Sequence, residues 1–166
     1  MSPKHICDES FGSDITETDF VSGCCMFIPR STLIEFGGFC EEYVAYSEDN
    51  EWSWRVRHAG GKLIYVPQAM LWHRVSSSMK KNTSQKGDAG TSSRAYYLMI
   101  RNNLWTIRLH ASPGGKKMLA LLILVGITIK IVAICAWSGF PAKIPLVVRG
   151  LVHGLVNQLP RHYSFG

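Results

Sequence analysis

Two adjacent carboxylates, Glu48 and Asp49, follow Ser47 at the point where a helical pattern begins. Serine is favoured at a helix N-cap, so both carboxylates are expected in the first helical turn. The positive end of the helix dipole favours their ionised forms there. An ionised carboxylate at the edge of a cleft can take a proton from a substrate hydroxyl, as a general base does. The alternative is that the pair only stabilises the helix end, which is common for acidic residues in a first turn.

Several ordered motifs flank this pair. A Ser-Gly step (residues 22–23) and a Gly-Gly-Phe turn (residues 37–39) precede it; an arginine at the end of its helix (Arg55) and a Val-Pro-x-Ala run leading to His73 follow it. This order resembles the C-terminal half of the catalytic domain of family 2 glycosyltransferases, especially the rhamnosyltransferase-like branch. The resemblance covers about residues 19–110. Several motifs in the same order are more specific than one motif.

The resemblance implies an α/β chain with part of a GT-A (Rossmann-like) fold, followed by apolar C-terminal helices. It implies transfer of a sugar from a nucleotide-sugar donor to a glycan or lipid-linked acceptor, with inversion at the anomeric carbon. Asp49 would be the general base, with Glu48 beside it. His73 aligns with a family histidine that in several enzymes joins the shell of a divalent metal, here Mn²⁺ or Mg²⁺. The alternative for His73 is a hydrogen-bonded core residue.

Five further residues are candidate substrate contacts: Gly23, Trp52, Trp54, Arg55 and Arg101. Gly23 suits a place where a ligand approaches the backbone, or a β-bulge. The two tryptophans could pack on sugar faces, although large aromatics at helical spacing usually pack in a core. Arg101 could meet a diphosphate, or lie on a solvated helix face.

The polar segment 75–93 resembles the family's flexible loop that closes over donor and acceptor. Lys80 and Lys81 in this segment are candidate phosphate contacts, or charges of a mobile loop.

The sequence also departs from the family pattern. Many relatives have Gly-Gly-Phe-Asp, whereas Cys40 stands in the last position here. The family's first half, with its nucleotide pocket and Asp-x-Asp metal motif, has no counterpart in residues 1–18. We therefore expect either a C-terminal fragment of a longer protein, or the product of a split or degenerate gene with an upstream half-domain chain as a partner. The alternative is a non-catalytic, membrane-associated remnant or partner subunit that lacks the donor-binding half. An upstream reading frame with an Asp-x-Asp half-domain would favour the enzyme.

Composition excludes several classes of protein. The net charge is +6 and charged residues make up 18% of the chain, which suits phosphate-bearing donors and a membrane surface. No zinc-finger spacing or aromatic-basic strand signature indicates nucleic-acid binding. The five cysteines form no Cys-x-x-Cys, which argues for a reducing compartment. No apolar signal segment follows the polar N-terminus, so we do not expect a secreted chain.

Patterning predicts the elements that position the candidate site. We expect an irregular lead-in (1–18), the half-domain (19–112) and a membrane-associated helical tail (113–166). Within the half-domain, apolar runs predict a buried central strand at 20–28, a strand at 62–66 and a short strand at 70–72. Helical spacing predicts helices at 31–36, 48–59 and 94–110, with an ion pair between Glu51 and Arg55.

The tail contains a run, 118–137, that is long enough to span a bilayer once. Lys130 within it costs ~3 kcal/mol on insertion scales, which nearly cancels the gain from its aliphatic residues. Spanning and interfacial placements both remain open. Lys116 and Lys117 suit a cytoplasmic flank, so we expect the cytoplasmic face of the cell membrane. A second helix, 146–159, shows the pattern of an interfacial or packing helix.

Overall fold

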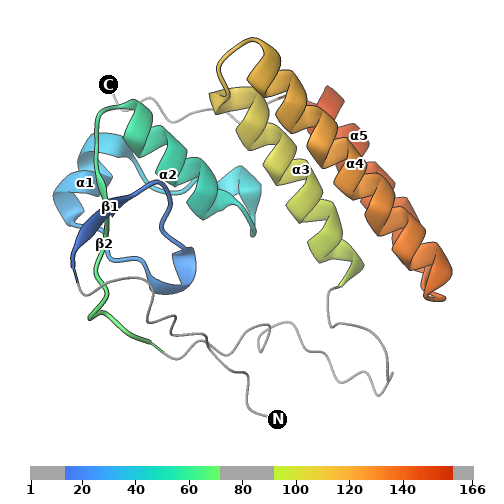
Figure 1. Ribbon diagram of the computed structural model, residues 1–166, viewed down its shortest axis with the longest axis horizontal. Helices are drawn as coiled ribbons and strands as arrows, with labels where there is room; N and C mark the ends of the chain where they lie inside the picture. The colour runs from blue at the N-terminus through green and yellow to red at the C-terminus, as the bar shows by residue number, and fades with distance from the viewer. Residues whose placement is uncertain (1–13, 72–91, 159–166) are drawn as a thin grey trace.

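The computed structural model describes residues 14–71 and 92–158. It places a small mixed region before the gap and a layer of three long helices after it (Figure 1). The helices are α1 (Arg30–Phe36), α2 (Glu48–His58), α3 (Ser93–His110), α4 (Gly115–Trp137) and α5 (Ile144–Val156). One-turn 3₁₀ helices lie at Gly23–Cys25, Glu41–Tyr43 and Pro141–Lys143.

The only sheet in the described residues has two antiparallel strands, β1 (Thr16–Thr18) and β2 (Leu63–Tyr65). Thr16 lies opposite Tyr65, and Thr18 lies opposite Leu63. The predicted strand at 62–66 is therefore confirmed, one residue shorter at each end. Helix α2 packs on β2 through a small core of Trp52, Val56 and Leu63.

The predicted buried strand at 20–28 is wrong. This segment contains the 3₁₀ turn Gly23–Cys25, and no residue of that turn is buried. A central strand needs hydrogen-bonded neighbours on both edges and covered faces. Neither is present among the described residues. Val21, Met26 and Ile28 are only partly buried against the core of α2 and β2, and Phe27 is 93% exposed. The predicted strand at 70–72 is also wrong for its described part, since Met70 and Leu71 are not in a strand.

The predicted helices are confirmed with small shifts at their ends. Helix α1 begins at Arg30, with Pro29 at the N-cap. Ser47 does occupy the N-cap position of α2, but its side chain makes no capping hydrogen bond. Its backbone is left-handed, with φ of 66°, whereas side-chain capping normally uses the β region. Ser92 caps α3, accepting from the Ala95 N–H at 3.1 Å.

Helices α3, α4 and α5 lie side by side, and α3 packs most extensively against α5 (Figure 1). Two glycines make the close approach possible. A Cβ on Gly150 would lie 2.8 Å from the Tyr97 carbonyl oxygen, and one on Gly154 would lie 2.6 Å from the Leu104 side chain. Arg108 of α3 adds hydrogen bonds to the Gly154 and Asn157 carbonyls at 2.7 and 3.0 Å. The small residues and the arginine fix α5 along α3.

Helix α4 is the one helix in residues 14–71 and 92–158 that is long and apolar enough to cross a membrane. Most of its surface is not covered by the rest of the chain. Length and composition alone do not decide whether it spans or lies along a bilayer.

Candidate functional site

Asp49 and Gly23, both predicted site residues, are brought into direct contact. Asp49 lies in the first turn of α2, and its Oδ2 accepts the Gly23 backbone N–H at 2.8 Å. Its Oδ1 accepts the Asn50 backbone N–H at 2.8 Å. Each carboxylate oxygen keeps further acceptor capacity, since it can accept about two hydrogen bonds. The contact fixes the carboxylate at the start of the 3₁₀ turn and leaves it able to accept further hydrogen bonds.

Glu48, next to Asp49, has a different environment. Its Oε2 atom is buried and has no hydrogen-bond partner among the described residues. Burial raises the pKa of Glu48, its own backbone N–H partly opposes this, and the nearby charge of Asp49 raises the pKa further. Two neighbouring carboxylates thus have separate environments, which is a common feature of acid–base sites and also of structural ion networks.

The loop that leads into this helix is held in an unusual conformation. Val44, Tyr46 and Ser47 all have positive φ angles, of 65°, 67° and 66°. Such conformations in residues other than glycine cost energy and persist only where surrounding contacts fix them. The strained stretch ends directly before Glu48, so it sets the direction in which α2 begins.

Asn102 of α3 holds much of this loop in place. This fully buried side chain donates from Nδ2 towards the carbonyls of Tyr43 at 2.9 Å, Ala45 at 2.8 Å and Tyr46 at 2.6 Å. Sequence reasoning did not assign it a role. A weak signal was present, because Asn102 is a polar residue at helical spacing with the buried apolar residues Leu98 and Trp105.

Arg101 supports the same loop. Its Nη2 donates to the carbonyls of Glu42 at 2.9 Å and Tyr43 at 3.2 Å. The guanidinium lies over the Trp105 ring, 4.2 Å from the centroid, and near the Tyr97 ring at 5.3 Å. These contacts give Arg101 a positioning role in the described structure; its contact with a diphosphate stays a prediction.

Glu51 links α2 to α3. It is fully buried, and its carboxylate accepts from Arg55 Nε at 3.0 Å and contacts His110 Nε2 at 3.1 Å. The predicted Glu51–Arg55 ion pair is therefore confirmed. Burial raises the pKa of Glu51, but the hydrogen bonds from His110 and Arg55 outweigh it, so the pKa lies below its usual range.

Arg55 also fixes the Gly-Gly-Phe turn. It donates from Nη1 to the Phe36 carbonyl and from Nη2 to the Gly38 carbonyl, the latter at 2.7 Å. Trp52 donates from Nε1 to the Gly37 carbonyl at 2.8 Å. The turn is thus held to α2 by two side chains one helical turn apart.

The two tryptophans occupy different places. Trp52 is 3% exposed and belongs to the core, although part of its ring lines a cavity. Trp54 is half-buried and stacks on His58, with ring centroids 5.2 Å apart, and on His110 at 6.2 Å. A role for either ring in binding a sugar stays a prediction.

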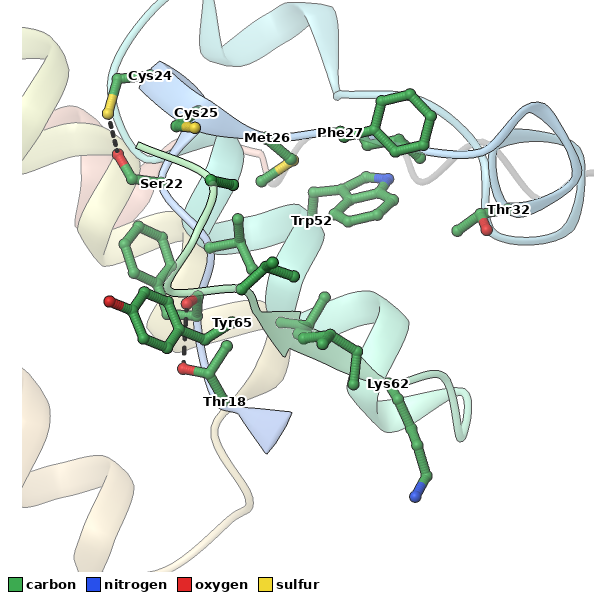
Figure 2. A pocket seen from close by; sticks show the side chains of 18 of the residues that line it. Thr18, Ser22, Cys24, Cys25, Met26, Phe27, Thr32, Trp52, Lys62 and Tyr65 are labelled. Carbon is green, nitrogen blue, oxygen red and sulfur yellow. Dashed lines mark hydrogen bonds between the residues drawn. The ribbon is translucent and has the colours of Figure 1, made fainter. Parts of the chain in front are cut away.

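A cavity of about 850 Å³ lies between the 20–29 segment and β2 (Figure 2). Figure 2 shows Trp52 beside Met26 and Phe27, while Ser22 and Cys24 lie at the other end of the cavity, joined by a hydrogen bond of 3.3 Å. Gly23 is also part of the lining. Gly23 contacts Asp49, whose own side chain is not among the residues that line this cavity.

The implied divalent metal finds no cluster of three or more ligating side chains in residues 14–71 and 92–158. His73, its predicted ligand, lies outside the described residues, as do Lys80 and Lys81. The described residues therefore do not by themselves fit a divalent metal, and no chemical step is derived through one.

Comparison with known proteins gives a partial match. Two curated relatives, from Mycobacterium tuberculosis strains CDC 1551 / Oshkosh and ATCC 25618 / H37Rv, are each 31% identical to the chain over 86 residues. Both are named N-acetylglucosaminyl-diphospho-decaprenol L-rhamnosyltransferase. The match covers 52% of this chain but only 28% of each relative. No family model and no solved structure matches the chain. The similarity supports glycosyl transfer in general terms.

Proposed function

We propose that the chain is the acceptor-side part of an inverting family 2 glycosyltransferase with a partial GT-A fold. The observation that carries this is the contact between Gly23 and Asp49, because it joins two motifs of the family resemblance, and Gly23 also lines a cavity. The partial similarity to rhamnosyltransferases agrees with the proposal. The substrates are then a nucleotide-sugar donor and a glycan or lipid-linked acceptor, and the place of work is the cytoplasmic face of the cell membrane.

In the proposed reaction, Asp49 takes the proton of the acceptor hydroxyl. The acceptor oxygen attacks the anomeric carbon from the side opposite the nucleoside diphosphate. The carbon–oxygen bond to the diphosphate breaks as the new glycosidic bond forms, so the configuration inverts. The hydrogen bond from Gly23 orients the carboxylate, and Arg101 and Asn102 hold the loop that aims α2. Such positioning is an established source of rate enhancement.

The donor side requires residues beyond those described. A nucleotide-binding half-domain, supplied by another chain or another segment, could pack against an apolar face that the described residues leave uncovered. This face includes Phe27 and Met70, which are 93% and 79% exposed, and the cavity beside β2. In the described residues β2 pairs only with β1, so its other edge can accept a further strand. A divalent metal, Mn²⁺ or Mg²⁺, would belong with that half.

A second candidate is a non-catalytic subunit that keeps this part of the fold. It is favoured by the hydrogen bonds that Asp49 accepts from two backbone N–H groups, because a purely structural carboxylate at a helix end makes the same kind of bond. Calorimetric titration of the full chain with UDP- and dTDP-sugars, with and without Mn²⁺, tests the donor side. Metal-dependent binding supports an enzyme with its own donor site, whereas absence of binding assigns the donor site to a partner chain.

A further inference from the structure

Helices α4 and α5 pack on each other, and each leaves apolar side chains exposed. On α4 the exposed residues include Leu122 at 60%, Ile129 at 62% and Trp137 at 94%. The exposed side of α5 adds four aliphatic residues: Val148, Val152, Leu155 and Val156. Exposed apolar surface on this scale marks an interaction site rather than ordinary protein surface.

The packing of α3 argues against a spanning position of α4. Helix α3 runs alongside α4 and α5 and carries Arg101, Asn102 and Arg108. Arg108 is bonded to the carbonyls at the end of α5, so the three helices form one unit. A spanning α4 would draw these polar groups to the depth of the hydrocarbon, which is costly. At 13 residues, α5 reaches roughly 20 Å and is too short to cross a core of about 30 Å beside it.

Charge identifies the surface that this layer fits. All 12 Asp and Glu residues of the chain lie at or before Asp88, whereas Lys and Arg continue throughout the three helices. Lys116 precedes the apolar part of α4, and Lys143 follows it. Lys143 lies near the rings of Tyr96 and Phe140, at 5.8 and 5.0 Å from their centroids. Aromatic rings with cations are typical of the membrane–water interface, and cations without acids favour anionic headgroups.

We propose that α4 and α5 lie in the plane of an anionic bilayer, with their exposed apolar sides at the boundary between headgroups and acyl chains. Exposed Lys130 can then extend its stem along the apolar surface and place its ammonium among headgroup phosphates. Helix α3 lies on the water side and holds the 42–47 loop, so the start of α2 sits at a fixed height above the membrane. This placement does not depend on sugar transfer.

Binding of the full chain to vesicles tests whether an anionic bilayer covers the exposed apolar sides of α4 and α5. Vesicles of phosphatidylglycerol and phosphatidylcholine in equal amounts should bind the chain at least roughly tenfold more strongly than phosphatidylcholine alone, and added salt should reduce the difference. Ile129→Glu should weaken binding roughly tenfold, because it places a charge in the apolar face. Ile34→Glu is the matched control, since Ile34 is 60% exposed but lies on α1. Equal loss in both variants, or no preference for the anionic vesicles, would overturn the proposal.

Labelling from one side of the bilayer tests the orientation. In a background with Cys7, Cys24 and Cys25 replaced by Ser, Ser112→Cys and Ser138→Cys each put an exposed thiol at one end of α4. The chain is bound to sealed vesicles from outside and treated with a membrane-impermeant maleimide. Equal labelling of both ends is expected for an in-plane helix. Protection of one end would show that α4 spans the bilayer and would refute the proposal.

Discussion

The backbone N–H of Gly23 donates to the carboxylate of Asp49 at 2.8 Å, across 26 positions of sequence. The contact ties the exposed 3₁₀ turn to the first turn of α2. It also orients the carboxylate to which we assign the base role. A hydrogen bond to a charged acceptor is worth more than one between neutral groups, so this link should be measurable in stability as well as in turnover.

Gly23→Pro should show how much the hydrogen bond from the Gly23 N–H to Asp49 contributes to stability. Proline removes the donor and puts a ring carbon in place of the amide hydrogen that now points at Asp49 Oδ2, while the extended backbone of Ser22 tolerates a following proline. We expect a loss of about 1–3 kcal/mol in the free energy of unfolding, measured in urea. Gly23→Ala keeps the donor and places a methyl group 3.4 Å from Oδ2, so it should change stability little. An equal loss in both variants would show that the hydrogen bond contributes nothing.

Asn102→Ala should loosen the loop before α2. It removes the donor that faces the Tyr43, Ala45 and Tyr46 carbonyls in this buried or half-buried loop. We expect a loss of roughly 2–4 kcal/mol in the free energy of unfolding, together with faster hydrogen exchange in residues 43–47.

Asn103→Ala is the neighbouring control for that variant. Asn103 bonds only locally along α3, to the Met99 carbonyl at 2.8 Å. Its loss should cost less than about 0.5 kcal/mol. If Asn102→Ala were no worse than this control, Asn102 would not be what holds the residues with positive φ in place.

Glu51 should make stability fall in acid. Its folded pKa lies below the ordinary value of 4.5, so its contribution is present above that value and is lost as the pH falls through the folded pKa. Glu51→Gln should remove this part of the acid transition and cost roughly 3 kcal/mol at pH 7, because Arg55 and His110 lose their buried charge partner. Urea unfolding from pH 3 to pH 7 measures both effects.

The exposed Glu35 on α1 supplies the control for the pH series. Glu35→Gln should leave the pH profile close to that of the wild type. A Glu51→Gln chain with the wild-type acid limb would mean that other groups carry the transition.

Gly150→Ala should separate α5 from α3. The added methyl would lie 2.8 Å from the Tyr97 carbonyl oxygen, which is backbone and cannot move aside cheaply. We expect a loss of about 1–3 kcal/mol from overpacking. Gly126→Ala in α4 meets nothing within 4 Å and should instead stabilise by up to about 1 kcal/mol. Thermal unfolding in mild detergent distinguishes the two, and a destabilised Gly126→Ala would contradict the packing described.

Local patterns predicted the helices well, because apolar spacing and end signals are properties of short stretches. The Glu51–Arg55 pair was predictable for the same reason, since the two residues are one helical turn apart. The conformation of segment 20–28 was not predictable, because its apolar composition indicates burial but not the type of secondary structure. The positioning by Asn102 depends on contacts more than 50 positions away in sequence, which no local pattern contains.

The base role of Asp49 is the central claim, and a transfer assay tests it most directly. The chain, together with the upstream half-domain that the proposal requires, would be given Mn²⁺ or Mg²⁺ and substrates suggested by the name of the similar mycobacterial proteins: N-acetylglucosaminyl-diphospho-decaprenol as the acceptor and a nucleotide-activated L-rhamnose as the donor. We predict rhamnosyl transfer with the wild type and with Asp19→Asn, a change at an exposed surface carboxylate. Asp49→Asn should transfer at least about 100-fold more slowly while remaining folded. Wild-type rates in Asp49→Asn would remove Asp49 from the base role, and no transfer by any of the chains would favour the non-catalytic subunit.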